Sequence, residues 1–269
     1  MAHIAGTGRP TALLIGHPGH ELRVYGWSRL VHPSVYVLTD GSGTTGMSRL
    51  ERTTHLLSGI GAKPGTVYGR LTDREIYHAM MAGETARFTE MVDELARAWA
   101  EDEIEVAASD ANEGYSATHD LCCEMARAAT ELVRLETGRQ IQLYTFCLTE
   151  WESAQTEDLP EDSVCVRLSD EVRDEKIAAA KSYAELGDEV ERALALVGPD
   201  YFGEEYLVPA RAYTGKDGPD KPDYERSGEQ RVAEGKYTNV LRYEHHVLPV
   251  FQALRKHISL RADVIKANA

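Results

Sequence analysis

The stretch Thr11-Ala-Leu-Leu-Ile-Gly-His-Pro-Gly-His-Glu21 decides the fold of this chain. Its first half is an apolar run that stops at Gly16, and two imidazoles and a carboxylate follow at once. A short apolar run bounded by a turn is typical of a strand buried inside a parallel sheet. The pattern predicts a strand that ends at the edge of a sheet and presents His17, His20 and Glu21 there.

Strands and helices are predicted to alternate from this stretch to about residue 148. Further short apolar runs predict strands at 34–39, 66–68, 104–109 and 141–148. Apolar residues at helical spacing predict helices at 21–31, 48–60, 73–81, 84–101 and 118–135. This alternation indicates an α/β fold with a Rossmann-like, mostly parallel sheet and helices on both faces.

The second half favours a mainly helical C-terminal elaboration on this core. We expect one domain over 1–269, with the α/β core and the metal site in 1–150 and helices and loops in 151–269. Helices are predicted at 170–186, 188–197 and 237–258, the last interrupted or kinked near Pro249. The pattern over 200–209 is mixed. The acidic stretch 151–162 and the Gly- and Pro-rich stretch 215–228 predict loops, the latter within a lid over 213–230.

Composition narrows the class of protein. The 269 residues are 42% hydrophobic, which suffices to bury a full core. The formal net charge of −15 argues against a nucleic-acid partner, and no apolar run approaches the length that spans a membrane. The N-terminus lacks a basic region followed by an apolar one, so we expect a cytoplasmic protein. Four cysteines without a CxxC pair indicate buried free thiols.

Polar residues follow three of the predicted strands, and in a parallel sheet such strand ends meet at one edge. They are His17, His20 and Glu21, then Asp40-Gly-Ser-Gly43, then the stretch from Asp110 to Asp120 that contains His119. Two imidazoles three residues apart and a distant third form an open tripod for zinc or another divalent metal. The alternative is that His17 caps the following helix and His20 lies on the surface.

Other polar and aromatic residues near these strand ends are candidates for binding a substrate. Asp40 and Ser42 lie in a turn that holds a sugar or phosphate through backbone N–H groups, or simply ends the strand. Arg49 and Arg52 bind an anionic group of the substrate, or they are solvated charges of the helix that pair with Glu51. Tyr115 is the best candidate for a pocket wall, ahead of Trp151 and Tyr206.

The first 150 residues resemble the LmbE-like/PIG-L family of metal-dependent N-deacetylases and amide hydrolases, which act on sugar-linked N-acyl groups. Four segments carry the resemblance in order along the chain. They are His17-Pro-x-x-Glu21, Leu38-Thr-Asp-Gly41, Ser48-Arg-Leu-Glu-Arg52 with Ile60-Gly-Ala62 at the end of its helix, and Glu113-Gly114 with His119-Asp120.

The resemblance implies that His17, His20 and His119 bind zinc, with His20 replacing a carboxylate. It also places Gly19 at the position of the general base and Ser116 at the first histidine of the later motif. If hydrolysis takes place, another group supplies the base; candidates are Asp110, Glu113, Asp120 and Glu21, with His245 and His246 closing over the site. Asp120 alternatively orients His119.

Three functions follow from this resemblance. The first is a zinc-dependent hydrolase that cleaves an amide or acyl bond on a small polar, sugar-like or natural-product metabolite, in a biosynthetic role. The second keeps the metal site but uses Fe²⁺ or another divalent metal for non-hydrolytic chemistry in a specialised pathway. The third is a binding protein that has lost catalysis. In each case the partner is a small molecule rather than a nucleic acid or a membrane, and a homo-oligomer stays open.

Overall fold

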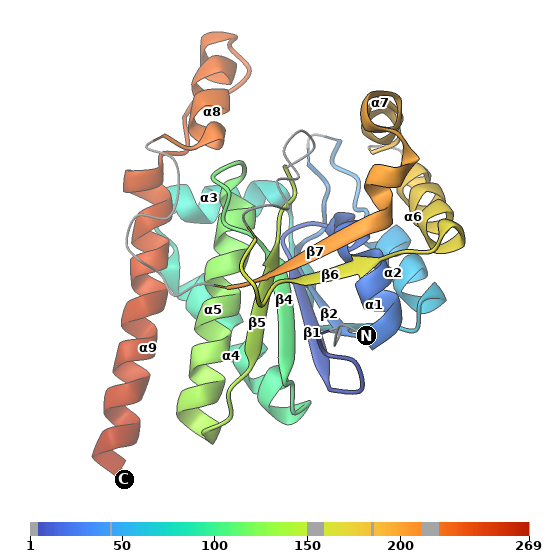
Figure 1. Ribbon diagram of the computed structural model, residues 1–269. Coiled ribbons are helices and arrows are strands. Elements are labelled where there is room, and N and C mark those ends of the chain that lie inside the picture. Colours follow the sequence, from blue (N-terminus) through green and yellow to red (C-terminus); the bar gives the residue numbers. More distant parts are fainter. Residues whose placement is uncertain (1–4, 44, 150–158, 184–185, 211–220, 269) are drawn as a thin grey trace.

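The computed structural model describes residues 5–43, 45–149, 159–183, 186–210 and 221–268 (Figure 1). Within this part of the chain, one sheet has the strand order β3-β2-β1-β4-β5-β7-β6. The strands are β1 (Thr11–Ile15), β2 (Ser34–Thr39), β3 (Lys63–Leu71), β4 (Val106–Asp110), β5 (Gln142–Phe146), β6 (Val164–Arg167) and β7 (Glu204–Pro209).

The α-helices of the described residues are α1 (Tyr25–Val31), α2 (Leu50–Gly59), α3 (Asp73–Ala82), α4 (Thr85–Glu101), α5 (Ala117–Thr137), α6 (Asp170–Ser182), α7 (Gly187–Val197), α8 (Asp223–Ala233) and α9 (Leu248–Asn268). Two short 3-10 helices, η1 (His20–Val24) and η3 (Pro199–Gly203), and a π-helical turn, η4 (Tyr243–Val247), complete the elements.

The centre of the sheet is parallel. β1 pairs with β2 on one side and β4 on the other, and β3 and β5 continue the parallel arrangement outward. Only β7 and β6, at the edge beyond β5, run antiparallel. The predicted mostly parallel α/β sheet is confirmed, and the carboxyl ends of its five parallel strands meet at one edge, at the top of Figure 1.

Alternate side chains of β1 enter two separate cores, one on each face of the sheet. Ala12 and Leu14 pack on the side of α3, α4, α5 and α9, and Leu13 and Ile15 pack on the side of α1, α2, α6 and α7. All four side chains are fully buried. The unbroken apolar run at 11–15 is therefore explained by burial of the strand on both faces.

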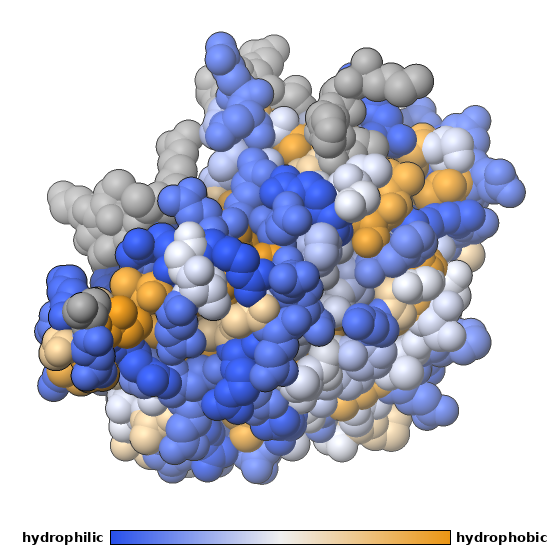
Figure 2. Space-filling view, turned by 90° about the horizontal axis from the view of Figure 1, so that it is seen from below, coloured by the Kyte–Doolittle hydropathy of each residue, from blue (hydrophilic) through white to orange (hydrophobic). Residues whose placement is uncertain are grey.

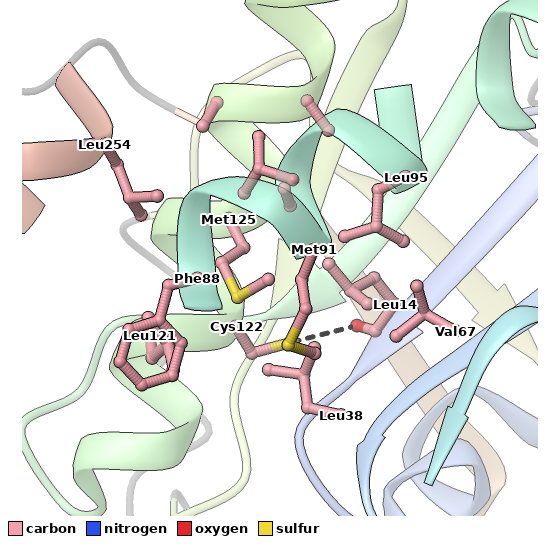
Figure 3. Packing of buried hydrophobic residues seen from close by; sticks show 14 of the residues in the cluster. Leu14, Leu38, Val67, Phe88, Met91, Leu95, Leu121, Cys122, Met125 and Leu254 are labelled. Atoms are coloured by element: carbon pink, nitrogen blue, oxygen red, sulfur yellow. Dashed lines mark hydrogen bonds between the residues drawn. The ribbon is translucent and has the colours of Figure 1, made fainter. Parts of the chain in front are cut away.

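Figure 3 shows the core under α4 and α5, where the predicted apolar face of α4 lies. Leu14 and Leu38 of the sheet meet Met91 of α4 and Met125 of α5 there. The thiol of Cys122 donates a hydrogen bond to the backbone oxygen of Leu14 at 3.3 Å. All four thiols are free, as predicted, but only Cys122 and Cys123 are buried, whereas Cys147 and Cys165 are partly exposed.

The strands β7 and β6, which extend the sheet beyond β5, were not predicted. Residues 200–209, whose pattern was mixed, form η3 followed by β7. Glu205 of β7 is buried, and its carboxylate accepts hydrogen bonds at 2.9 Å from the backbone N–H groups of Gly26 and Trp27 at the start of α1 and from Lys176 of α6. These long-range contacts make an acidic segment into an interior strand.

The loop predicted in the second half is partly wrong. A loop was expected over 215–228, but residues 223–228 form the first part of α8, while 211–220 lie outside the described residues. Tyr224 is 7% exposed, so burial outweighs the polar composition of this stretch. The interruption expected near Pro249 corresponds to η4, a π-helical turn that ends at Val247 and runs directly into α9 at Leu248. Proline lacks the N–H of a regular helical hydrogen bond, which agrees with an irregular turn at this place.

Two features describe the surface. Among the described residues, the apolar segments of the helices are too short for any of them to cross a membrane. Figure 2 shows one face of the molecule, which is mostly hydrophilic with separate apolar spots, as the charge of −15 leads one to expect.

Candidate metal centre

The three predicted imidazoles come together at the carboxyl edge of the sheet. His17 follows β1, His20 begins η1, and His119 lies in the first turn of α5. The ring centroid of His17 lies 5.2 Å from those of both His20 and His119, and the latter two are 4.6 Å apart. Each pair of rings packs edge to face, so the cluster is compact.

The turn between His17 and His20 depends on Gly19. Its φ of 107° and ψ of −20° lie in a region that glycine adopts readily and other residues do not. This conformation brings the backbone N–H of His20 within 3.3 Å of the backbone oxygen of His17. Gly19 stands at the general-base position of the resembled family. It has no side chain, and its backbone conformation disfavours one.

Glu21 supports this turn from beneath. Its side chain is fully buried and accepts hydrogen bonds from the Gly19 N–H at 2.7 Å, the Thr53 hydroxyl at 2.9 Å and the Tyr183 hydroxyl at 2.5 Å. Burial raises the pKa of this carboxyl, and the hydrogen bonds from Tyr183 and Gly19 oppose that shift. Fully buried and held by three donors, Glu21 is placed to position the turn rather than to contact a substrate.

Carboxylates stand behind two of the three rings. Oδ2 of Asp110, the last residue of β4, lies 2.9 Å from Nδ1 of His20 and accepts the Gly16 N–H at 2.8 Å. Nδ1 of His17 lies 2.7 Å from both the Thr39 hydroxyl and Oδ1 of Asp73. By its geometry this Asp73 oxygen makes a close contact with His17 rather than a well-aligned hydrogen bond.

These carboxyls differ in their proton affinity. Burial raises the pKa of Asp110 to about 6, although the charge of His119 opposes the shift. Burial also acts to raise the pKa of Asp73, but the contacts with His17 outweigh it and hold this pKa below its usual value. Carboxylates behind the ring nitrogens are a common arrangement around histidines that bind metals.

Two of the imidazoles, those of His20 and His119, are held neutral by burial. Burial lowers the pKa of His20 and of His119 well below the ordinary value, and the neighbouring imidazoles lower it further. Nδ1 of His119 is buried and has no hydrogen-bond partner. A neutral imidazole with an unpaired buried nitrogen is in the form that binds a metal.

The donor set of three imidazoles fits zinc or another borderline divalent metal. As the side chains stand in the described residues, no three His, Cys, Asp or Glu groups have the geometry of a metal site. The rings are in contact, but edge-to-face packing does not direct three nitrogens at one point. Metal binding therefore requires the rings to turn about their side-chain torsions.

The remaining base candidates hold the loop before α5. Glu113 accepts hydrogen bonds from the backbone N–H groups of Leu148 and Thr149, at 2.8 and 3.2 Å. Oδ1 of Asp120 accepts the N–H groups of Glu113 and Gly114 at 3.1 and 3.0 Å. Burial raises the pKa of Asp120 to about 7. Both carboxyls thus have a structural task, and among the four predicted base candidates Asp110 is the one with a hydrogen bond to an imidazole.

A cavity of about 720 Å³ opens beside the imidazoles. His20, His119 and two of the predicted substrate residues, Arg49 and Tyr115, line it. The Tyr115 ring is 55% exposed, and its centroid lies 6.0 Å from that of His119. Segments from both halves of the chain form the other walls, including β5, α6, α7, η3 and β7.

The turn at Asp40 and Ser42 does not line this cavity. Asp40 Oδ1 accepts the Ser42 N–H at 2.9 Å, which closes the turn on itself. Nε of Arg49 donates to the Gly41 backbone oxygen at 2.7 Å. A Cβ on Gly41 would lie only 2.7 Å from this Arg49 nitrogen, so the turn acts as a support that places the guanidinium at the cavity.

Of the other residues predicted near the site, some line the cavity and others lie away from it. Tyr206 lines the cavity, whereas Arg52 lines a separate groove between α1, α2 and α6. His245 and His246 belong to η4 and do not line the cavity. Trp151 and residues 213–220 of the expected lid lie outside the described residues. The rest of that lid region is mainly α8, whose Asp223 N–H donates to the Gly114 backbone oxygen at 2.7 Å.

Two residues of the site were not predicted from the sequence: Asp73, which contacts His17, and Leu186, which lines the cavity. Asp73 begins α3, directly after β3, and β3 extends to Leu71 rather than ending at residue 68. An acidic residue two positions beyond a strand of the same parallel sheet was a usable signal, because that strand ends at the same edge. Leu186 lies between α6 and α7 and carried no signal of its own.

No family model and no curated protein matches the sequence. Solved structures with some likeness of fold include the A40926 pseudoaglycone deacetylase Dbv21, at 19% identity over 78% of this chain and 100% of that chain, with a TM-score of 0.47. The conserved protein TT1542 from Thermus thermophilus shows 16% identity over 77% and 99%, with a TM-score of 0.48. A zinc-inhibited form of the teicoplanin deacetylase Orf2 shows 12% identity over 77% and 100%, with a TM-score of 0.45. At this distance, no property of those proteins is transferred to this chain.

Proposed function

We propose that this chain is a metal-dependent hydrolase, with Zn²⁺ as its metal, that cleaves an amide or another acyl bond on a small polar metabolite. The observation that supports it best is the mutual contact of three imidazoles, those of His17, His20 and His119, beside a cavity. A divalent metal on such ligands polarises a carbonyl and lowers the pKa of bound water to about 7. The resemblance of the first 150 residues to the N-deacetylase family points to the same reaction.

The protein's own groups have distinct roles in this proposal. Asp110 and Thr39 contact Nδ1 of His20 and His17, which leaves the other nitrogen of each ring for a metal once the rings have turned. Nε of Arg49 is held by Gly41, which leaves its terminal N–H groups for an oxygen of the substrate at the cavity. In this proposal Asp110 and Thr39 orient the two imidazoles, and Arg49 orients the substrate.

Proton transfer is the step for which this chain departs from its resembled family. Gly19 supplies no base, and Glu21, Glu113 and Asp120 are engaged in holding turns. Asp110 contacts His20 and has a pKa raised to about 6 by burial, with one carboxylate oxygen unpaired. We assign to Asp110 the task of holding the proton at Nδ1 of His20.

The test is hydrolysis of a panel of N-acylated amino sugars by the purified protein, before and after dialysis against a chelator. Chelation should abolish turnover, and added zinc should restore it. His119→Ala should be inactive, whereas His78→Ala, which removes an exposed imidazole on α3, should not change turnover. Full activity of the metal-free protein, or of His119→Ala, would contradict the proposal.

A second candidate is non-hydrolytic chemistry with Fe²⁺ at the same imidazoles. The conformation of Gly19 favours it, because it disfavours any side chain at the base position. A site without a general base lacks the group that usually removes a proton from water during hydrolysis. Three histidines also suit iron. Substrate-dependent oxygen consumption by the iron-loaded protein would support this candidate, and its absence together with zinc-dependent hydrolysis would exclude it.

A further inference from the structure

Mostly apolar atoms surround the position that a side chain on Gly19 would take, in the turn between His17 and His20. A Cβ added to Gly19 would lie 3.1 Å from Cδ1 of Leu186 and 3.9 Å from Cδ1 of Tyr183. The nearest polar atom, a terminal nitrogen of Arg49, is also 3.9 Å away. Leu186 therefore stands next to the turn between His17 and His20, where a carboxylate would lie in the resembled family.

Leu186 continues into an apolar wall of the cavity. Ala180 of α6, Val190 of α7 and Phe202 of η3 line the same cavity and are themselves between 5% and 8% exposed. The ammonium group of Lys176, which also lines the cavity, pairs with Glu205 at 2.9 Å, and both side chains are buried. Leu186, Ala180, Val190 and Phe202 thus form an apolar patch in a cavity that charged residues, among them Arg23, Glu189 and Asp200, also line.

The size of the cavity exceeds what an acetyl group needs. Its volume of about 720 Å³ is in the range of pockets for whole small ligands. An acetyl group has a single methyl to place beside the turn between His17 and His20, which would leave the partly exposed side chain of Leu186 in contact with water. A longer acyl group would cover it.

We propose that this wall binds the acyl part of the substrate, and that the acyl group is an apolar chain longer than acetyl. The inference rests on the proposed function, since it assumes acyl-bond cleavage beside the imidazoles. The expected product is then a medium-chain carboxylic acid, with its carboxylate near His20 and Arg49 and its chain along Leu186. Each methylene buried against the wall should tighten binding about fourfold.

The test is calorimetric titration of the zinc-supplemented protein with acetate, butyrate, hexanoate and octanoate. Affinity should rise with chain length, and octanoate should bind at least about tenfold more tightly than acetate, because several methylenes become buried. Leu186→Asp should remove this rise. Leu196→Asp is the matched control, because Leu196 is an exposed residue of α7 that does not line the cavity.

Two outcomes would overturn the inference. One is an affinity of the wild-type protein that does not change with chain length, which needs no variant to interpret. The other is an unchanged rise in Leu186→Asp, with folding checked by its melting temperature. Zinc content measured on the same samples separates the two proposals. Zinc bound with a flat series refutes the acyl wall alone, and a rising series without zinc refutes the metal-dependent hydrolase alone.

Discussion

Nδ1 of His20 lies 2.9 Å from Oδ2 of Asp110, although the two residues are 90 positions apart in the chain. The contact exists because β1 and β4 are parallel neighbours, so that the residues at their carboxyl ends meet. Asp110 has no exposed surface and also accepts the Gly16 N–H, which fixes its carboxylate relative to β1. The sheet therefore sets the orientation of the His20 ring.

Asp110→Asn should weaken zinc binding about 10- to 100-fold, since loss of a carboxylate behind a metal-binding histidine typically has this effect. The measurement is competition for zinc with a chromophoric chelator. Asp93→Asn is the matched control, because Asp93 makes a similar contact, 2.7 Å to His257, away from the cavity. Equal zinc affinity in the two variants would show that Asp110 does not support a metal ligand.

Gly19→Ala should lower the free energy of unfolding by about 1–3 kcal/mol, because a side chain at φ of 107° is strained. Gly59→Ala, in the last turn of α2 with no heavy atom within 4 Å of the added Cβ, should be neutral or slightly stabilising. Urea denaturation measures both. A Gly19→Ala protein as stable as the wild type would mean that the turn adopts another conformation.

Tyr183→Phe should cost about 1–3 kcal/mol of stability, because the buried Glu21 carboxylate loses one of its three donors. It should also weaken zinc binding, since Glu21 holds the turn between His17 and His20. Tyr237→Phe removes a hydroxyl that contacts Arg231 on the exposed surface, and should change neither property. If Tyr183→Phe lowered stability but left zinc affinity unchanged, Glu21 would support the core and not the turn.

The sequence predicted the centre of the fold well because its signals are local. The apolar run of β1 and the strand at 34–39 are buried on both faces, and their lengths agree with the structure. The spacing of His17 and His20 around a Pro-Gly turn identified the edge at which His119 also lies. Each of these features depends on residues within a few positions of one another.

What the sequence did not predict depends on long-range contacts. β7 contains two adjacent glutamates, and it forms because Glu205 accepts hydrogen bonds from α1 and α6, more than 25 residues away in each case. The contact between Asp73 and His17 needs the full length of β3, whose polar and Gly-containing sequence reads as a shorter strand. The tasks of Glu113 and Asp120 as loop supports likewise follow from partners that only the fold brings near.

Elemental analysis of protein purified without added metal tests the central claim most directly. Wild-type protein should carry about one divalent metal ion per chain, zinc above others, on its three histidines. His17→Ala and His119→Ala should each lose it while His78→Ala retains it. Wild-type protein that carries no metal and takes up none from a zinc-containing buffer, or variants that keep the full metal content, would contradict a metal site at these imidazoles.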